Sequence, residues 1–135
     1  MALLQWSDDL AVNIEFIDSQ HRELMNGVNH LHSMATQSPP DQGRISDALF
    51  QLLEHAMNHF IAEEEMFQRL EFPELPEYKS HNDAFNLKAQ SIIQELGDNP
   101  TLCSDTLEYL KNWLTEHILA KDKSYAKFLN RNGIN

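Results

Sequence analysis

Residues 42–70 read QGRISDALFQLLEHAMNHFIAEEEMFQRL, and the spacing of side chains within this stretch decides the fold. A seam of mostly apolar residues recurs there every three or four positions, which is the period of one face of an α-helix. The stretch therefore predicts a long helix that buries one face against other helices. The seam consists of Ile45, Leu49, Leu52, Ala56, His59, Glu63, Met66 and Leu70.

Two neighbouring positions of this seam are polar, namely His59 and Glu63, which lie one helical turn apart. A carboxylate buried in a helical bundle is costly unless it is paired or bound to a cation. Because an imidazole stands beside the carboxylate, the pair predicts a metal site inside a bundle of helices.

Three further periodic segments accompany this helix, and they predict helices at about 18–37, 76–96 and 104–129. Asp18 is a good N-cap for the first of them, and Pro76 suits the first turn of the second. The connections between the helices are short, so successive helices run antiparallel. The sequence thus predicts an all-α, up-down-up-down four-helix bundle that forms a single domain over residues 1–135.

Residues 1–17 precede the predicted helices and alternate apolar with polar side chains at Val12, Ile14 and Phe16. Such alternation is typical of a β-strand, but a lone strand has no pairing partner in a helical chain. We therefore expect residues 1–17 to form an extended N-terminal arm that packs on the bundle.

The composition limits the partners and the compartment that the chain is suited to. Its formal net charge is −11, which repels nucleic acid phosphates and anionic lipid, so neither nucleic acid nor membrane is an expected partner. Cys103 is the single cysteine, which excludes an intrachain disulfide and suits a reducing, cytoplasmic location. The sequence contains no large apolar surface stripe, which is compatible with a monomer.

The last predicted helix changes register near its middle. Its seam runs to His117 and resumes one residue out of step at Ile118 and Asp122. An ordinary helix would place His117 and Asp122 about 140° apart, whereas a single π-type turn would bring both inward. We therefore predict a local distortion near residues 117–122.

Each predicted helix places at least one metal-type ligand toward the interior. A single buried histidine is more often an ordinary core residue, but an inward set spread over four helices predicts a metal centre. Imidazole and carboxylate together suit iron, manganese or zinc. The candidate ligands are His21, His59, Glu63, His81, His117 and Asp122.

These residues stand in motifs through which the chain resembles the bacterial hemerythrins over almost its full length. The motifs are IDSQH at 17–21, HFIAEE at 59–64, Phe72-Pro73 and NWLTEHILAKD at 112–122, after an arm that carries Trp6. The resemblance implies two iron ions in a non-haem centre with an oxo or hydroxo bridge. It also implies that the chain binds molecular oxygen for storage, delivery or sensing.

The resemblance also implies a role for each candidate ligand. His21 and His59 would bind one iron, while His117 and two histidines of the third helix would bind the other. Glu63 and Asp122 would bridge the two irons. The apolar wall of the oxygen pocket would consist of Phe60, Trp113, Leu114 and Ile118.

The third helix departs from the family pattern, which is HxxxH. Residues 77–85 read EYKSHNDAF, and an ungapped match sets the two family histidines at Tyr78 and Asn82. A match with a one-residue gap instead uses Glu77 and His81. We expect His81 to be a ligand and Tyr78 to face the same metal, with Glu77 as the lesser option.

The departure bears on function, because one histidine fewer leaves a second coordination position for Tyr78, Glu77 or water to fill. A phenolate or carboxylate would stabilise Fe(III), so we expect oxygen to be held less reversibly than in a standard carrier. The alternatives are a di-iron oxidase or peroxidase, a nitric-oxide-handling enzyme, and a metal-storage bundle. A non-catalytic protein that binds oxygen, or another small diatomic molecule or peroxide, is the preferred reading.

Overall fold

The structure, a computed structural model, describes residues 4–37, 39, 41–98, 104–117 and 123–134 of the chain. Within these residues it is helical and contains no β-strand. A short 3-10 helix, η1 (Asp8–Leu10), precedes five α-helices. They are α1 (Glu15–Ala35), α2 (Gln42–Arg69), α3 (Leu75–Asp98), α4 (Ser104–Glu116) and α5 (Lys123–Arg131).

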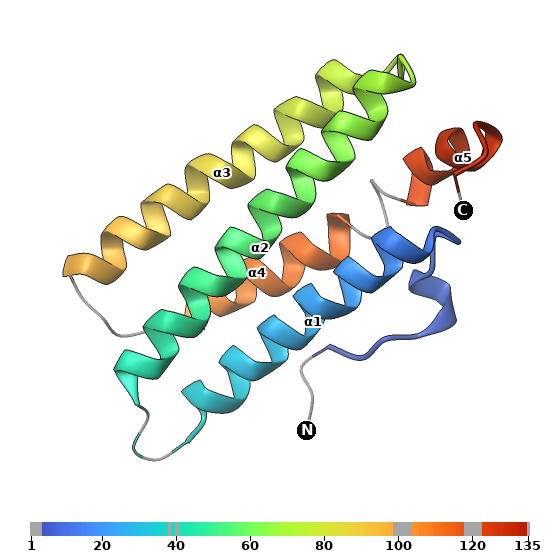
Figure 1. Ribbon diagram of the computed structural model, residues 1–135. Coiled ribbons are helices and arrows are strands. Elements are labelled where there is room, and N and C mark those ends of the chain that lie inside the picture. The colour runs from blue at the N-terminus through green and yellow to red at the C-terminus, as the bar shows by residue number, and fades with distance from the viewer. Residues whose placement is uncertain (1–3, 38, 40, 99–103, 118–122, 135) are drawn as a thin grey trace.

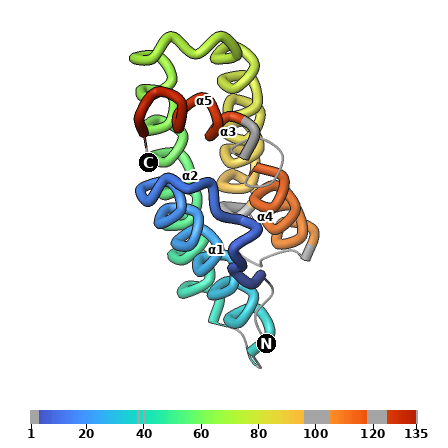
Figure 2. Tube along the Cα trace, turned by 90° about the vertical axis from the view of Figure 1, so that its right-hand side faces the viewer, coloured from blue at the N-terminus to red at the C-terminus, as the bar shows by residue number. Residues whose placement is uncertain are grey.

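The helices α1 to α4 form a bundle, with α2 and α3 side by side and α5 at the end where α1 begins (Figures 1 and 2). The seam predicted for residues 42–70 faces the interior of this bundle: Ile45, Leu49 and Ala56 are buried, as are the two polar positions. The predicted all-α four-helix bundle is therefore confirmed. None of the described helices combines the length and the apolar character needed to cross a membrane.

The start of α1 differs from the prediction that Asp18 caps it. The helix begins at Glu15, and Ile14 holds the N-cap position. Asp18 is buried inside the first turns, where its carboxylate accepts a hydrogen bond from the backbone N–H of Val12 at 2.9 Å. The side chain thus caps the arm that enters the helix, which explains why its sequence position suggested a helix start three residues too late.

The N-terminal arm packs on the bundle as predicted, but it is not extended throughout. Its described part contains η1 and ends with Val12 and Ile14, which are both buried. The side-chain amide of Asn29 on α1 donates to the carbonyl of Leu4 and accepts from its N–H, each at 2.7 Å. This pair of bonds satisfies the peptide groups of Leu4 that a neighbouring strand would otherwise satisfy.

Within the described residues, the predicted helix over residues 104–129 corresponds to α4 and α5, which lie on either side of residues 118–122. The π-type turn expected at the register slip is present at His117. Residues 118–122, which include Ile118 and Asp122, lie outside the described residues. Helix α5 buries Tyr125, Ala126 and Leu129 at the end of the bundle.

Two separate apolar clusters fill the interior. The larger one lies between α1, α2, α3 and α4, and includes Leu24, Phe60 and Phe85. The smaller one lies at the α5 end, and includes Ile17 and Phe67. Along both α1 and α2, a short polar stretch of the buried face separates the residues of one cluster from those of the other.

Candidate metal centre

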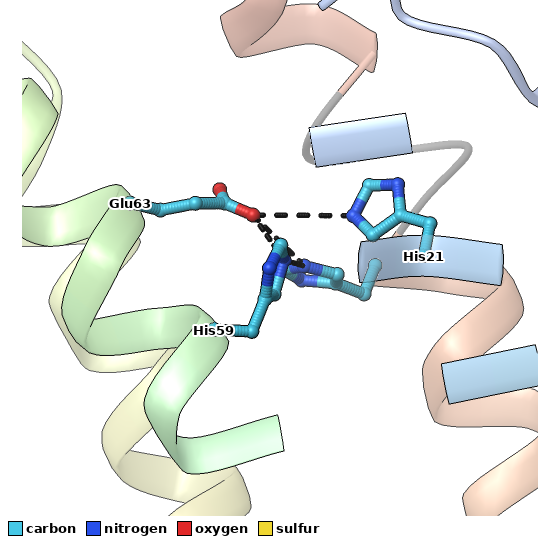
Figure 3. Close-up of side chains that lie close together, drawn as sticks. His21, His59 and Glu63 are labelled. Atoms are coloured by element: carbon cyan, nitrogen blue, oxygen red, sulfur yellow. Dashed lines mark hydrogen bonds and ion pairs between the residues drawn. The ribbon is translucent and has the colours of Figure 1, made fainter. Parts of the chain in front are cut away.

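Four polar side chains fill the layer between the two apolar clusters. They are His21 on α1, His59 and Glu63 on α2, and His117 at the end of α4, and all four are fully buried. One ligand atom from each lies within 4.8 Å of the others, which makes this a group able to hold a metal ion. Figure 3 shows Glu63 reaching from α2 toward His21 on the opposite helix.

The Nε2 atoms of the three histidines lie around the oxygen Oε1 of Glu63. It contacts Nε2 of His59 directly and lies 3.7 Å from Nε2 of His117 and 3.9 Å from Nε2 of His21. The Nε2 atoms of His59 and His117 are 3.2 Å apart. Donors that share one metal ion at bond lengths near 2.1 Å lie roughly 3–3.5 Å from one another, so the Nε2 atoms of His59 and His117 already have this spacing and the other donors lie slightly farther away.

The chemistry of these donors also fits a metal ion. A buried carboxylate costs several kcal/mol unless a positive charge compensates it, with roughly 3–5 kcal/mol lost when a partner is removed. Three imidazoles and one carboxylate are ligands that iron, manganese and zinc accept. The sequence prediction that His21, His59, Glu63 and His117 converge in the core therefore agrees with their observed positions.

Gln20 supports this group, and the sequence analysis missed it. Its side-chain oxygen Oε1 accepts a hydrogen bond from Nδ1 of His59, which fixes that ring with Nε2 toward Glu63. The available signal was its place directly before His21 in the motif at 17–21. A residue one step along the helix is rotated by about 100°, which turns Gln20 toward the neighbouring helix.

Replacing Gln20 with leucine should weaken metal binding by about 10- to 100-fold, the usual cost of losing a partner that orients a histidine ligand. The Nδ1 of His59 would lose its acceptor, so the ring would no longer be held in one tautomer. Competition with a coloured chelator would measure the affinity. Ser19→Ala, at the exposed neighbouring position, is the matched control and should leave the affinity unchanged. Equal affinities for the two variants would contradict the role of Gln20.

Tyr78 on α3 faces the group, as its seam position predicted, while Glu77 is exposed. Its hydroxyl donates a hydrogen bond to Oε2 of Glu63, the carboxylate oxygen that does not meet the imidazoles. The ring is fully buried and packs edge-on against Phe67 and Tyr125, with centroid distances of 4.9 and 5.4 Å. In the structure Tyr78 therefore positions Glu63, and its role as a metal ligand stays a prediction.

His81 and Asn82 lie beside the group without joining it. The ring of His81 is half-buried and stacks parallel to that of His117, with centroids 5.8 Å apart and an interplanar angle of 1°. Asn82 is fully buried, and its amide donates to Oε1 of Glu64 at 3.2 Å. The described residues thus leave the ligand role of His81 as a prediction, as they do for Asp122.

Aromatic and aliphatic side chains cover the group on the side of the larger cluster. The ring of Phe60 lies 5.4 Å from that of His117 and 5.2 Å from that of Trp113, measured between centroids. Trp113 and Leu114 also line a cavity of about 10 Å³, and among the described residues that line it the tryptophan alone carries a polar atom in its side chain. The wall expected from Phe60, Trp113 and Leu114 is present, and it keeps the donors away from water.

Comparisons with known proteins match this geometry. The family model described as the hemerythrin HHE cation binding domain covers residues 12–129. A bacteriohemerythrin of Stenotrophomonas maltophilia is 29% identical, over 93% of this chain and 81% of that protein. A bacteriohemerythrin of Clostridium acetobutylicum is also 29% identical, over 89% and 96% of the two chains.

A crystal structure of wild-type hemerythrin superimposes with a TM-score of 0.86 at 25% identity, covering 93% of this chain and 97% of that one. The family match covers most of the chain, the fold agrees, and a buried histidine and glutamate group lies where a metal fits. The chain belongs to the hemerythrin family, whose members hold a non-haem di-iron centre.

Proposed function

We propose that this chain binds molecular oxygen at a non-haem di-iron centre, for storage, delivery or sensing. The observation that carries the proposal is the convergence of His21, His59, Glu63 and His117 in a fully buried layer. Asp122 would be the second carboxylate ligand, as the family resemblance implies. On α3, Tyr78 or His81 would supply the remaining metal ligand.

The chain's own residues would hold the centre and shield it. An iron pair bound there would supply the electrons that oxygen takes up on binding. Gln20 would orient His59, and Tyr78 would orient Glu63, through the hydrogen bonds that they make. Phe60, Trp113 and Leu114 would exclude water, which protects a reduced metal site from side reactions.

The size and polarity of the free space support a small ligand. A cavity of about 10 Å³ lies one helical turn from the donors, since Leu24, Ala56 and Leu114 line it and each stands three residues from a histidine. A space of this size is at the lower limit for one water molecule and offers too few polar partners to hold one. Packing this tight beside the donors excludes a large substrate, which leaves a small ligand such as oxygen, nitric oxide or peroxide.

The remaining proposals concern the setting in which the protein works. The net charge of −11 argues against nucleic acid and anionic membrane as partners. A single cysteine suits the cytoplasm. We propose a cytoplasmic protein that works as a monomer.

The function is tested by measuring iron per chain in protein purified from iron-rich medium, with visible spectra in air and after degassing. We expect two irons and a charge-transfer spectrum that bleaches on degassing. A ferric spectrum that does not change on degassing would contradict reversible oxygen binding. A metal-free protein would contradict the di-iron proposal itself.

An enzyme is the second candidate, and the absence of the HxxxH pair from α3 is the observation that favours it. Tyr78 and Asn82 stand at the two positions where the ungapped match sets histidines, and both are fully buried. Oxygen ligands in place of imidazole would favour the ferric state. Consumption of peroxide or nitric oxide by the iron-loaded protein, over many turnovers, would identify this alternative.

A further inference from the structure

A series of side-chain contacts between α3 and α4 begins at the donor group. Its first contact is the stack of His81 on His117, with centroids 5.8 Å apart. Its second contact, one turn along each helix, joins Phe85 to Trp113 at 4.1 Å between centroids. The indole of Trp113 also stacks on His117 itself, at 4.9 Å and an interplanar angle of 13°. Trp113 is therefore an oxidisable ring in direct contact with a candidate metal ligand.

The third contact of the series reaches the surface. Tyr109 precedes Trp113 by one helical turn, and residues four apart on a helix are neighbours on the same face. Its ring centroid lies 5.4 Å from the ammonium of Lys88, which is exposed on α3. Tyr109 is half-buried and packs against the larger apolar cluster, of which Trp113 is a member. The side chains of His117, Trp113 and Tyr109 thus join the donor group to solvent along α4.

Trp113 and Tyr109 differ in what can accept their protons. The indole N–H of Trp113 is buried and has no hydrogen-bond partner among the described residues, so an oxidised indole has no acceptor for its proton. Burial also disfavours the positive charge that the ring would then carry. Tyr109 is partly exposed, so water can accept the proton of its phenol as an electron leaves. An electron therefore moves from Tyr109 to an oxidised Trp113 rather than in the reverse direction.

Tyr78 is another oxidisable ring beside the donor group, but its surroundings differ. Its hydroxyl is bonded to Glu63, and its ring is fully buried. Tyr125 lies 5.4 Å away, between centroids, and is only 8% exposed. Among the described residues, this second route ends inside the smaller apolar cluster. Trp113 is thus the better connection between the donor group and solvent.

We propose that Trp113 and Tyr109 form a route by which single electrons from solvent reach the metal centre after peroxide has oxidised it. Trp113 gives an electron to the centre, and Tyr109 replaces that electron. A strong oxidant is required, because the ammonium of Lys88 beside the phenol ring opposes the loss of an electron. The inference deepens the proposed function and rests on it, since the iron pair must be present.

Electrons and protons balance for each molecule of hydrogen peroxide consumed. Each time Tyr109 gives up an electron, its proton goes to water, and a one-electron donor in solution, such as ascorbate, returns a hydrogen atom to the phenoxyl oxygen. Two such transfers, with two protons from water, break the O–O bond and convert one peroxide into two molecules of water. Two donor molecules are oxidised by one electron each.

The test mixes the iron-loaded, full-length protein with hydrogen peroxide, freezes it early in the reaction and records the electron paramagnetic resonance spectrum. The chain has three tyrosines and two tryptophans, so single substitutions to phenylalanine assign each radical. We expect a tyrosyl radical in the wild-type protein that is lost in Tyr109→Phe. Peptide mapping after longer reaction should locate the oxidised side chain at Tyr109.

Two further variants make the test specific. Trp113→Phe should also lose the Tyr109 radical, although Tyr109 is intact, because the oxidisable link to His117 is gone. Trp6→Phe, in the N-terminal arm, is the matched control and should keep the radical. Consumption of peroxide at the expense of ascorbate should be lost in Tyr109→Phe and Trp113→Phe and retained in the control. Iron content and thermal melting check that each variant is loaded and folded.

Each outcome decides the inference. A Tyr109 radical that depends on Trp113 would support it. A radical at Tyr78 instead, or a Tyr109 radical that survives Trp113→Phe, would overturn it. Iron-loaded protein that forms no radical and no oxidised peptide would also overturn it and leave the oxygen-binding proposal standing. Protein that holds no iron would overturn both.

Discussion

Glu63→Gln is expected to lower the affinity of the protein for metal by at least about 100-fold, because it removes a ligand charge as well as a bond. The substitution keeps the shape of the side chain but removes the negative charge of the carboxylate that faces three imidazoles. Calorimetric titration with Co(II) or Zn(II) measures the loss. The rise in melting temperature that the ion gives the wild-type protein should disappear with it.

The neighbouring acidic residues provide the control for this experiment. Glu65, two positions along α2, is exposed, and Glu65→Gln changes the net charge by the same amount. Its affinity for the metal should match that of the wild-type protein. If both variants lose affinity to the same extent, the net charge rather than the buried carboxylate controls binding, and the assignment of Glu63 fails.

Phe60→Ala is expected to destabilise the metal-free protein by about 3–5 kcal/mol, the range for deleting a buried aromatic side chain. Phe60 is 2% exposed, and its ring contacts Phe85, Trp113 and His117. The space left behind would lie against the donor group and admit water there. Urea denaturation in the presence of a chelator measures the stability without any contribution from metal.

The next residue along the chain provides the matched control. Ile61 is 54% exposed on the outer face of α2, so Ile61→Ala should cost no more than about 0.5 kcal/mol. Phe60→Leu keeps most of the side-chain volume, so it should lose less stability than the alanine variant. If Ile61→Ala lost as much stability as Phe60→Ala, the substitutions would be disturbing the helix itself rather than the packing of Phe60 against the site.

The seam of residues 42–70 was sufficient to predict the bundle because it combines a helical period with a buried histidine and glutamate. The period fixes which side chains face inward irrespective of the partner helices. The predicted convergence of His21 and His117 with this pair required only that each continue the seam of its own helix. The bounds of α2 and α3 agree with the prediction to within one or two residues.

The parts that the sequence did not predict depend on contacts between distant segments. Asp18 has the chemistry of an N-cap, and only the position of Val12 shows that its carboxylate serves the arm instead. The hydrogen bonds of Gln20 to His59 and of Tyr78 to Glu63 depend on the rotation of facing helices about their axes. A helical period does not determine that rotation to the accuracy of a hydrogen bond.

The placement of the donor layer between two apolar clusters has a consequence for folding cooperativity. Each cluster can support its own unit of structure, and a polar layer transmits little packing energy between them. A metal ion bound to α1, α2 and α4 would cross-link this layer. We expect hydrogen exchange to find that the end with α5 opens independently in the metal-free chain, and that it opens only with the whole bundle once the ion is bound.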